Sequence, residues 1–191
     1  MKLTHQLILA SNSPRRKEIL EKAGFEFSIQ VKEIDECFPD TMPVEEVAPY
    51  LAKQKALAFG ELSADSLVIT ADTVVIAEGQ ILNKPQDKAD AERMLWLLSN
   101  RVHEVVTGVC IRTNEELISF SDKAYVTIKK LTKEEIDYYI ETCKPFDKAG
   151  AYGIQDFFGM VCVQGIQGSF YTVMGLPAHA LYEKLLPWQK K

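Results

Sequence analysis

Apolar runs of strand length alternate with helix signals through the first third of the chain, and this alternation most constrains how the chain can fold. The run at 7–10 predicts a buried strand, and apolar residues at 14–24 share one face of a predicted helix. Alternating apolar and polar residues at 25–31 are typical of a half-buried strand. An alanine- and lysine-rich helix is expected over 45–60. The order predicts strands with helices packed against them.

Further along the chain, predicted strands follow one another more directly, and those at 105–112 and 117–128 are expected to pair. Alternation followed by paired strands indicates an α/β fold with a mixed sheet flanked by helices. The 191 residues, 47% of them hydrophobic, suit one compact domain over 1–191 or two small lobes that share a core. The other predicted elements are a strand at 67–76 interrupted by Thr-Ala-Asp-Thr, a turn at 78–80, a helix capped by Asp87 that ends near Ser99, a helix opened by a Thr132–Glu135 capping box, and a last helix opened by Pro177.

The composition argues against several classes of protein. A net charge of −5 lacks the basic excess of proteins that coat DNA or RNA, so no polynucleotide partner is expected and a phosphate ligand would be a small anion. No apolar stretch near the N-terminus is long enough for a signal peptide or a membrane span, which predicts a soluble, cytoplasmic protein. Four widely spaced cysteines and three scattered histidines argue against structural zinc, and the thiols are expected to be buried and reduced.

A helix start directly after the first strand carries two arginines. Ser13 is a favourable N-cap and Pro14 suits the first helical position, so the free N–H groups of this turn can bind an anion. Arg15 and Arg16 would place bidentate phosphate ligands beside those groups, and Ser11 opens the same motif. Because cations are unfavourable at the positive end of a helix, a bound anion would explain the pair. The alternative is a charged turn at the surface.

Two acidic positions are candidates for a metal site. Asp72 lies within an apolar run, where a carboxylate needs a partner or a metal ion, or caps a turn as an Asx motif. Glu36 belongs to an acidic loop at 33–40, and hard oxygen ligands of this kind suit Mg²⁺ or Mn²⁺. A run of acidic residues can equally be a solvated surface, so the residues alone leave both alternatives open.

Lysines and one glutamine complete the candidates for ligand binding. Lys53 and Lys55 lie two apart on a predicted helix and cannot share a face, so only one is expected to point into a cleft. Lys84 precedes a proline that keeps its backbone extended. Lys148 lies in a glycine-rich segment that ends at Gln155, whose amide can both donate to and accept from a base edge. Each lysine alone is more commonly a solvated surface residue, and Gln155 can instead cap its own loop.

The chain contains six motifs in this order: Ala10-Ser-Asn-Ser-Pro-Arg-Arg16, Leu51-Ala-Lys-Gln-Lys-Ala56, Ala71-Asp-Thr73, Lys84-Pro85, Asp147-Lys-Ala-Gly-Ala-Tyr-Gly-Ile-Gln155 and Val173-Met-Gly-Leu-Pro177. Together they resemble the motifs of the Maf family, and the resemblance extends from about Leu7 to Leu186. No single motif would be specific, whereas six in order over one chain are. The chain contains neither the G-x-x-x-x-G-K-[ST] motif of P-loop ATPases nor the G-x-G-x-x-G motif of dinucleotide-binding folds.

The resemblance implies an elongated α/β fold with a cleft between two lobes, similar to that of inosine triphosphate pyrophosphatases, and homodimers that hydrolyse nucleotides between the α and β phosphates. Asp72 matches the catalytic base, and Glu36 with Asp72 would hold a divalent metal, Mg²⁺ or Mn²⁺. Arg15 and Arg16 match phosphate ligands. The other expected substrate contacts are Ser11, Ser13, Lys55, Thr73, Lys84, Lys148 and Gln155, with Arg15, Thr73 and Gln155 at the positions that set base choice.

Three motif versions, Pro-Arg-Arg, Ala-Asp-Thr and Tyr-Gly-Ile-Gln, are similar to those of the subfamily that acts on dTTP and UTP. A sister subfamily that acts on 7-methyl-GTP differs at these places. Asp156 is a departure, because this subfamily usually has glycine after the glutamine, and the shape of the base pocket depends on it. The expected role is cleansing of the nucleotide pool, with CTP or modified pyrimidine nucleotides as further candidate substrates. The rival hypothesis is a non-enzymatic regulator of septum formation and cell division, with which the family is also associated.

Overall fold

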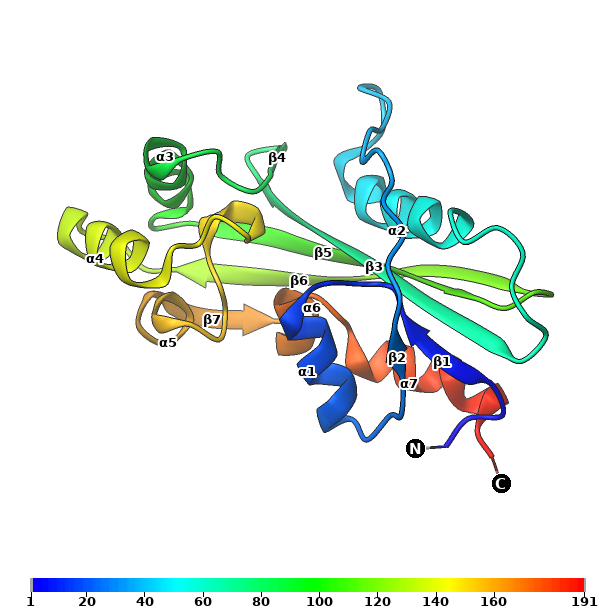
Figure 1. Ribbon diagram of the computed structural model, residues 1–191. Coiled ribbons are helices and arrows are strands. Elements are labelled where there is room, and N and C mark those ends of the chain that lie inside the picture. The colour runs from blue at the N-terminus through cyan, green and yellow to red at the C-terminus, as the bar shows by residue number, and fades with distance from the viewer. Residues whose placement is uncertain (1, 191) are drawn as a thin grey trace. The chain divides into compact units, whose positions relative to one another are not determined.

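A computed structural model describes residues 2–190, and its sheet is mixed, as the sequence predicts. The strands are Gln6–Leu9 (β1), Ser28–Ile29 (β2), Ser66–Ala77 (β3), Gln80–Leu82 (β4), Val102–Arg112 (β5), Leu117–Ile128 (β6) and Val163–Gln167 (β7). Their order is β2-β1-β3-β5-β6-β7, with β4 paired to β3 (Figure 1). β1 is parallel to β2 and β3, whereas β4 is antiparallel to β3 and β7 to β6. The predicted α/β class is confirmed.

The helices follow local signals that the sequence contains. They are Pro14–Lys22 (α1), Val47–Leu57 (α2), Lys88–Leu98 (α3), Lys133–Cys143 (α4), Phe157–Cys162 (α5), Phe170–Met174 (α6) and Ala178–Leu185 (α7). Asp87 caps α3 by accepting from the Asp90 N–H at 2.8 Å, and Thr132 and Glu135 form the predicted capping box of α4. Within residues 2–190, no helix combines the length and the apolar character that crossing a membrane requires.

Two predicted strands differ from those observed. β3 is continuous over Ser66–Ala77, so the predicted interruption at Thr-Ala-Asp-Thr is wrong. The strand predicted at 25–31 is reduced to Ser28–Ile29, and Ile29 is 47% exposed. A two-residue strand pairs only with β1 and has few neighbours against which an apolar face could pack.

The chain divides into two compact units, and β3, β5 and β6 contribute residues to both. Unit 1 consists of the chain up to Asp72, Thr107–Asp122, and the chain from Gly175 onward. Unit 2 consists of Thr73–Val106 and Lys123–Met174. The prediction of a single domain over residues 1–191 stays a prediction.

Unit 1 brings helix α2 into close contact with strand β5. Ala52, Ala56 and Cys110 are all fully buried in one cluster. A Cβ atom at Gly108 would lie 2.2 Å from the backbone nitrogen of Pro49, so only glycine permits this approach of helix and strand. Pro49 lies in the first turn of α2, where proline is tolerated.

The four cysteines are free, as expected, but only two are buried. Cys110 and Cys162 are fully enclosed, and burial raises the pKa of both thiols to about 11. Cys37 is exposed and Cys143 is half-buried, so the prediction of buried thiols is wrong for these two. None of the four forms a disulfide with another cysteine of the described chain.

Unit 2 buries a histidine next to a tyrosine. His103 on β5 is 2% exposed, and its Nε2 lies 2.8 Å from the hydroxyl of Tyr152. The two rings pack edge to face with centroids 5.4 Å apart. The Nδ1 atom of His103 has no hydrogen-bond partner among residues 2–190. Burial lowers the pKa of His103 to about 4, so the ring is neutral near pH 7.

We expect His103 to make folding stability depend on pH below neutrality. The pKa of histidine is about 6.5 in an unfolded chain and about 4 here, so between these values the unfolded state binds more protons. The contribution of the neutral ring is complete above pH 6.5, and about 2–3 kcal/mol of it is lost as the pH falls to 4.5. Urea unfolding of the wild type and of His103→Gln, whose amide can still bond Tyr152, measures this difference. Equal loss of stability in both proteins would exclude His103 as the titrating group.

Candidate active site

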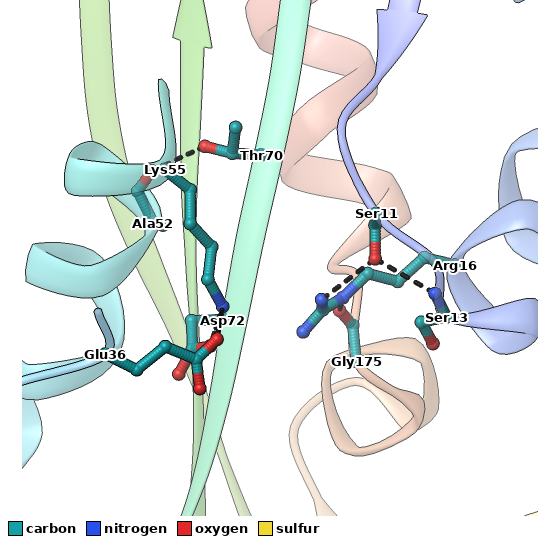
Figure 2. A network of polar contacts seen from close by, with 9 residues as sticks. All are labelled: Ser11, Ser13, Arg16, Glu36, Ala52, Lys55, Thr70, Asp72 and Gly175. Carbon is teal, nitrogen blue, oxygen red and sulfur yellow. Dashed lines mark hydrogen bonds and ion pairs between the residues drawn. The ribbon is translucent and has the colours of Figure 1, made fainter. Parts of the chain in front are cut away.

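Two carboxylates meet one ammonium group in unit 1 (Figure 2). The Nζ atom of Lys55 lies 2.6 Å from Oδ1 of Asp72 and 2.7 Å from Oε1 of Glu36. The side chains of Lys55 and Asp72 are only 17% and 15% exposed, whereas that of Glu36 is 53% exposed. Lys55 is therefore the partner that a carboxylate in an apolar strand requires. Asp72 lies within a continuous strand, so its alternative interpretation as an Asx cap of a turn is wrong.

The packing of α2 on β3 sets this contact. The hydroxyl of Thr70 donates to the carbonyl oxygen of Ala52 at 2.6 Å. Thr70 and Asp72 are two residues apart and share a face of the strand, while Ala52 and Lys55 are three apart and share a face of the helix. The buried Thr70–Ala52 hydrogen bond thus places Lys55 opposite Asp72 (Figure 2). Lys53, on another face of α2, is exposed, as the spacing predicts.

The start of α1 holds a guanidinium group by two of its donors. Arg16 donates from Nε to the carbonyl oxygen of Gly175 at 2.8 Å and from Nη1 to the hydroxyl of Ser11 at 3.2 Å. Ser13 is the N-cap residue as predicted, but its side chain makes no capping hydrogen bond. Its N–H donates instead to Ser11 Oγ at 3.2 Å. The hydroxyl of Ser11 thus links the turn to the arginine (Figure 2).

The two clusters of unit 1 share one electrostatic environment. Burial lowers the pKa of Arg16 from its usual value, and the nearby charge of Arg15 lowers it as well. The carboxylates of Asp72 and Glu36 act in the opposite direction and raise it. Arg16 nevertheless stays protonated, as arginine does in proteins. The charges at Arg16, Asp72 and Glu36 therefore interact, and the arrangement can hold an anion and a cation together.

Unit 2 contributes the other predicted site residues, which are Thr73, Lys84, Lys148 and Gln155. The exposed Lys84 follows β4, and the Asn83 carbonyl next to it accepts from the N–H of Gly150 at 3.2 Å. This hydrogen bond joins the segment of Lys84 to the loop that carries Lys148 and Gln155. Gln155 is exposed at the turn of this loop, whereas the side chain of Lys148 is only 12% exposed. Their predicted roles stay predictions.

Gly175 takes part in the site without a local signal in the sequence. Its carbonyl oxygen anchors Arg16 although 159 residues separate the two. Gly175 has φ of 115°, a conformation that only glycine adopts without strain. In the sequence, Gly175 is marked only by the Val173-Met-Gly-Leu-Pro177 motif, which by itself indicates no contact with Arg16.

The chain is similar to known proteins over nearly its whole length. Residues 6–187 match the family described as Maf-like protein. A protein of Phocaeicola vulgatus named dTTP/UTP pyrophosphatase is 48% identical over 183 residues, which cover 95% of each chain. Proteins with the same name are 49% identical in Porphyromonas gingivalis, over 95% of this chain and 93% of that one, and 47% identical in Bacillus anthracis, over 94% of each. With a match over nearly its whole length and relatives this similar, the chain belongs to the Maf family.

Proposed function

We propose that this protein is a nucleoside triphosphate pyrophosphatase that converts dTTP and UTP to the monophosphate and pyrophosphate. The observation that carries the proposal is the Asp72 carboxylate, which is held by Lys55 at 2.6 Å and lies in the field of Arg16. Relatives that cover nearly the whole chain are named for this activity. A non-enzymatic regulator of septum formation is not favoured, because these relatives are named for an enzymatic activity.

The proposed reaction is hydrolysis at the α-phosphorus. A water oxygen attacks this phosphorus, its proton passes to the Asp72 carboxylate, and the bond to the oxygen between the α and β phosphates breaks. Pyrophosphate leaves with that oxygen and the monophosphate remains. Lys55 orients the carboxylate, and Arg15 and Arg16 neutralise the triphosphate. Charges already in position contribute most of the catalysis in a phosphoryl transfer of this kind.

We propose Mg²⁺ or Mn²⁺ as the cofactor, with Glu36 and Asp72 as its protein ligands. The residues fit such a cation, because the two carboxylates meet at the Lys55 ammonium through Glu36 Oε1 and Asp72 Oδ1, at 2.7 and 2.6 Å, and each has a second oxygen that would bind the ion. No larger group of His, Cys, Asp and Glu gathers in the described part of the chain as a closed metal centre would need. Two carboxylates suit an ion that takes its other ligands from phosphate oxygens and water. When bound, the ion would neutralise negative charge on the phosphates.

A nucleotide panel tests the proposed function. Purified protein is incubated with dTTP, UTP, CTP, GTP or 7-methyl-GTP in the presence of Mg²⁺, Mn²⁺ or EDTA. We expect equal amounts of monophosphate and pyrophosphate from dTTP and UTP with metal, and no turnover in EDTA. Release of orthophosphate would contradict cleavage between the α and β phosphates. Preference for 7-methyl-GTP would assign the chain to the sister subfamily.

The cellular compartment and the oligomeric state belong to the same proposal. We propose a cytoplasmic homodimer, as the family resemblance implies. Sedimentation equilibrium at several protein concentrations would show a mass twice the 21.5 kDa of one chain. A single species at the mass of one chain would contradict the dimer.

Gln155 is the proposed reader of the base, and its replacement by alanine tests this role. The amide offers a donor and an acceptor that match O4 and N3–H of uracil or thymine. Removing the amide should lower kcat/KM for dTTP and UTP by a factor that corresponds to about 1–3 kcal/mol. It should change kcat/KM for a poor purine substrate little, because only the pyrimidine edge loses its partner. Steady-state kinetics on dTTP, UTP, CTP and GTP measure this. An equal decrease for all four would leave Gln155 as a structural residue.

A further inference from the structure

A buried tyrosine on α4 fixes the loop that carries Gln155. Tyr139 is fully buried, and its hydroxyl oxygen accepts a hydrogen bond from the N–H of Gly153 at 2.9 Å. Burial raises the pKa of Tyr139, so the hydroxyl keeps its proton. It donates this proton toward Oδ2 of Asp156, 3.4 Å away. Two consecutive hydrogen bonds thus connect the Gly153 backbone to the Asp156 carboxylate.

The Asp156 carboxylate faces these groups instead of its own helix. Asp156 is the N-cap residue of α5, where aspartate normally accepts from the first free N–H groups of the helix. Here the side chain makes no capping hydrogen bond. Its Oδ2 lies 3.6 Å from Nζ of Lys148, which also donates to Asp147 at 2.7 Å. The negative charge of Asp156 therefore helps to balance the positive charge of Lys148, whose side chain is only 12% exposed.

These side chains close over the backbone next to Gln155. A Cβ atom at Gly153 would lie 2.3 Å from Oδ2 of Asp156 and 3.0 Å from Cε of Lys148, so both side chains occupy the space that a residue 153 side chain would need. Ile154, the residue before Gln155, is packed equally closely, because a Cβ atom at Gly159 would lie 1.8 Å from its carbonyl oxygen. Both neighbours of Gln155 are thus held in place, and Gln155 itself is exposed.

We propose that Tyr139, Lys148 and Asp156 form a clamp that positions Gln155 for reading the base. Asp156 is then a specificity-determining residue that acts through the loop, although the resembled subfamily usually has glycine there. Lys148 serves the clamp as a positioning residue. The inference rests on the proposed function, because it assigns the clamp to recognition of dTTP and UTP.

Removal of the tyrosine hydroxyl tests whether the clamp exists. In Tyr139→Phe the Gly153 amide loses its acceptor, and we expect its hydrogen exchange, followed by NMR, to become roughly 5–30-fold faster. Tyr138→Phe is the matched control, because Tyr138 is the next residue of the same helix but is 54% exposed. Its ring contact with Phe157 does not need the hydroxyl. Unchanged exchange in Tyr139→Phe would overturn the clamp.

Removal of the Asp156 charge tests what the clamp does. Asp156→Asn keeps an acceptor for Tyr139 but leaves Lys148 without this carboxylate. We expect KM for dTTP and UTP to rise about 5–30-fold and kcat to change by less than about twofold, with CTP affected less than either. The preference for uracil and thymine over cytosine should decrease accordingly.

The two measurements fail in different ways. Hydrogen exchange needs no turnover, so it tests the clamp even if the wild type hydrolyses no nucleotide, an outcome that would reject the proposed function alone. Faster exchange in Tyr139→Phe together with unchanged KM values in Asp156→Asn would overturn the role in base reading. A rise in KM that is equal for dTTP, UTP, CTP and GTP would also overturn it.

Discussion

Asp72→Asn is expected to lower kcat for dTTP and UTP by about 10²–10⁴-fold, the range that a positioned general base supplies. The amide that replaces the carboxylate cannot take the proton of the attacking water. Lys55 keeps its second carboxylate partner, Glu36, at 2.7 Å, so the ammonium is not left alone. Nucleotide binding should therefore persist while turnover is nearly lost.

A matched control separates this loss from a general effect of charge. Glu21→Gln makes the same chemical change on an exposed side chain of α1, in the same unit, and should keep wild-type turnover. Pyrophosphate release gives kcat, and calorimetric titration with a non-hydrolysable dTTP analogue gives the binding constant. If Asp72→Asn keeps most of its turnover, Asp72 is not the base. If it loses binding to the same extent as turnover, its role is to hold the nucleotide.

The predictions that succeeded depend on signals within a few residues. Asp87 caps α3 and the Thr132–Glu135 box opens α4 because each cap bonds N–H groups three residues away in the sequence. The spacing of Lys53 and Lys55 likewise predicts that only one of the two lysines turns inward, because a helix has a fixed angle per residue. Such arguments need only the local chain.

The predictions that failed concern polar groups whose partners are distant in the sequence. Asp72 and Thr70 were expected to interrupt β3 because polar residues in an apolar run lack local partners. Lys55 and the carbonyl oxygen of Ala52, 17 and 18 residues earlier, supply those partners from α2, and the strand continues. At α1 the prediction holds in part: Ser13 is the N-cap residue, but its N–H donates to Ser11 Oγ, which also accepts from Arg16. Only the packing of α2 on β3 within unit 1 reveals the partners of Asp72 and Thr70.

The arginine at the start of α1 gives the second large effect that we expect. Arg16→Ala should weaken binding of the dTTP analogue by about 1.5–3 kcal/mol, the range for hydrogen bonds to a charged group. Ser11 and Gly175 already occupy two of its donors, at 3.2 and 2.8 Å, so its orientation is set before a ligand arrives. A guanidinium held in this way loses little side-chain entropy when it binds a phosphate.

Comparison of the triphosphate with the nucleoside decides whether this arginine binds phosphate. Thymidine carries no phosphate, so its affinity should be the same in the wild type and in Arg16→Ala. Lys17→Ala is the matched control, because Lys17 is the next residue of α1 and its side chain is 49% exposed. It should change both affinities by less than about 0.5 kcal/mol, as substitutions away from buried features do.

Arg16→Ala also leaves the Gly175 carbonyl without the donor that Arg16 supplies, so thermal unfolding of each variant is measured alongside binding. Equal loss of affinity for dTTP analogue and thymidine would mean that Arg16 shapes the fold of unit 1, and that the phosphates are bound elsewhere.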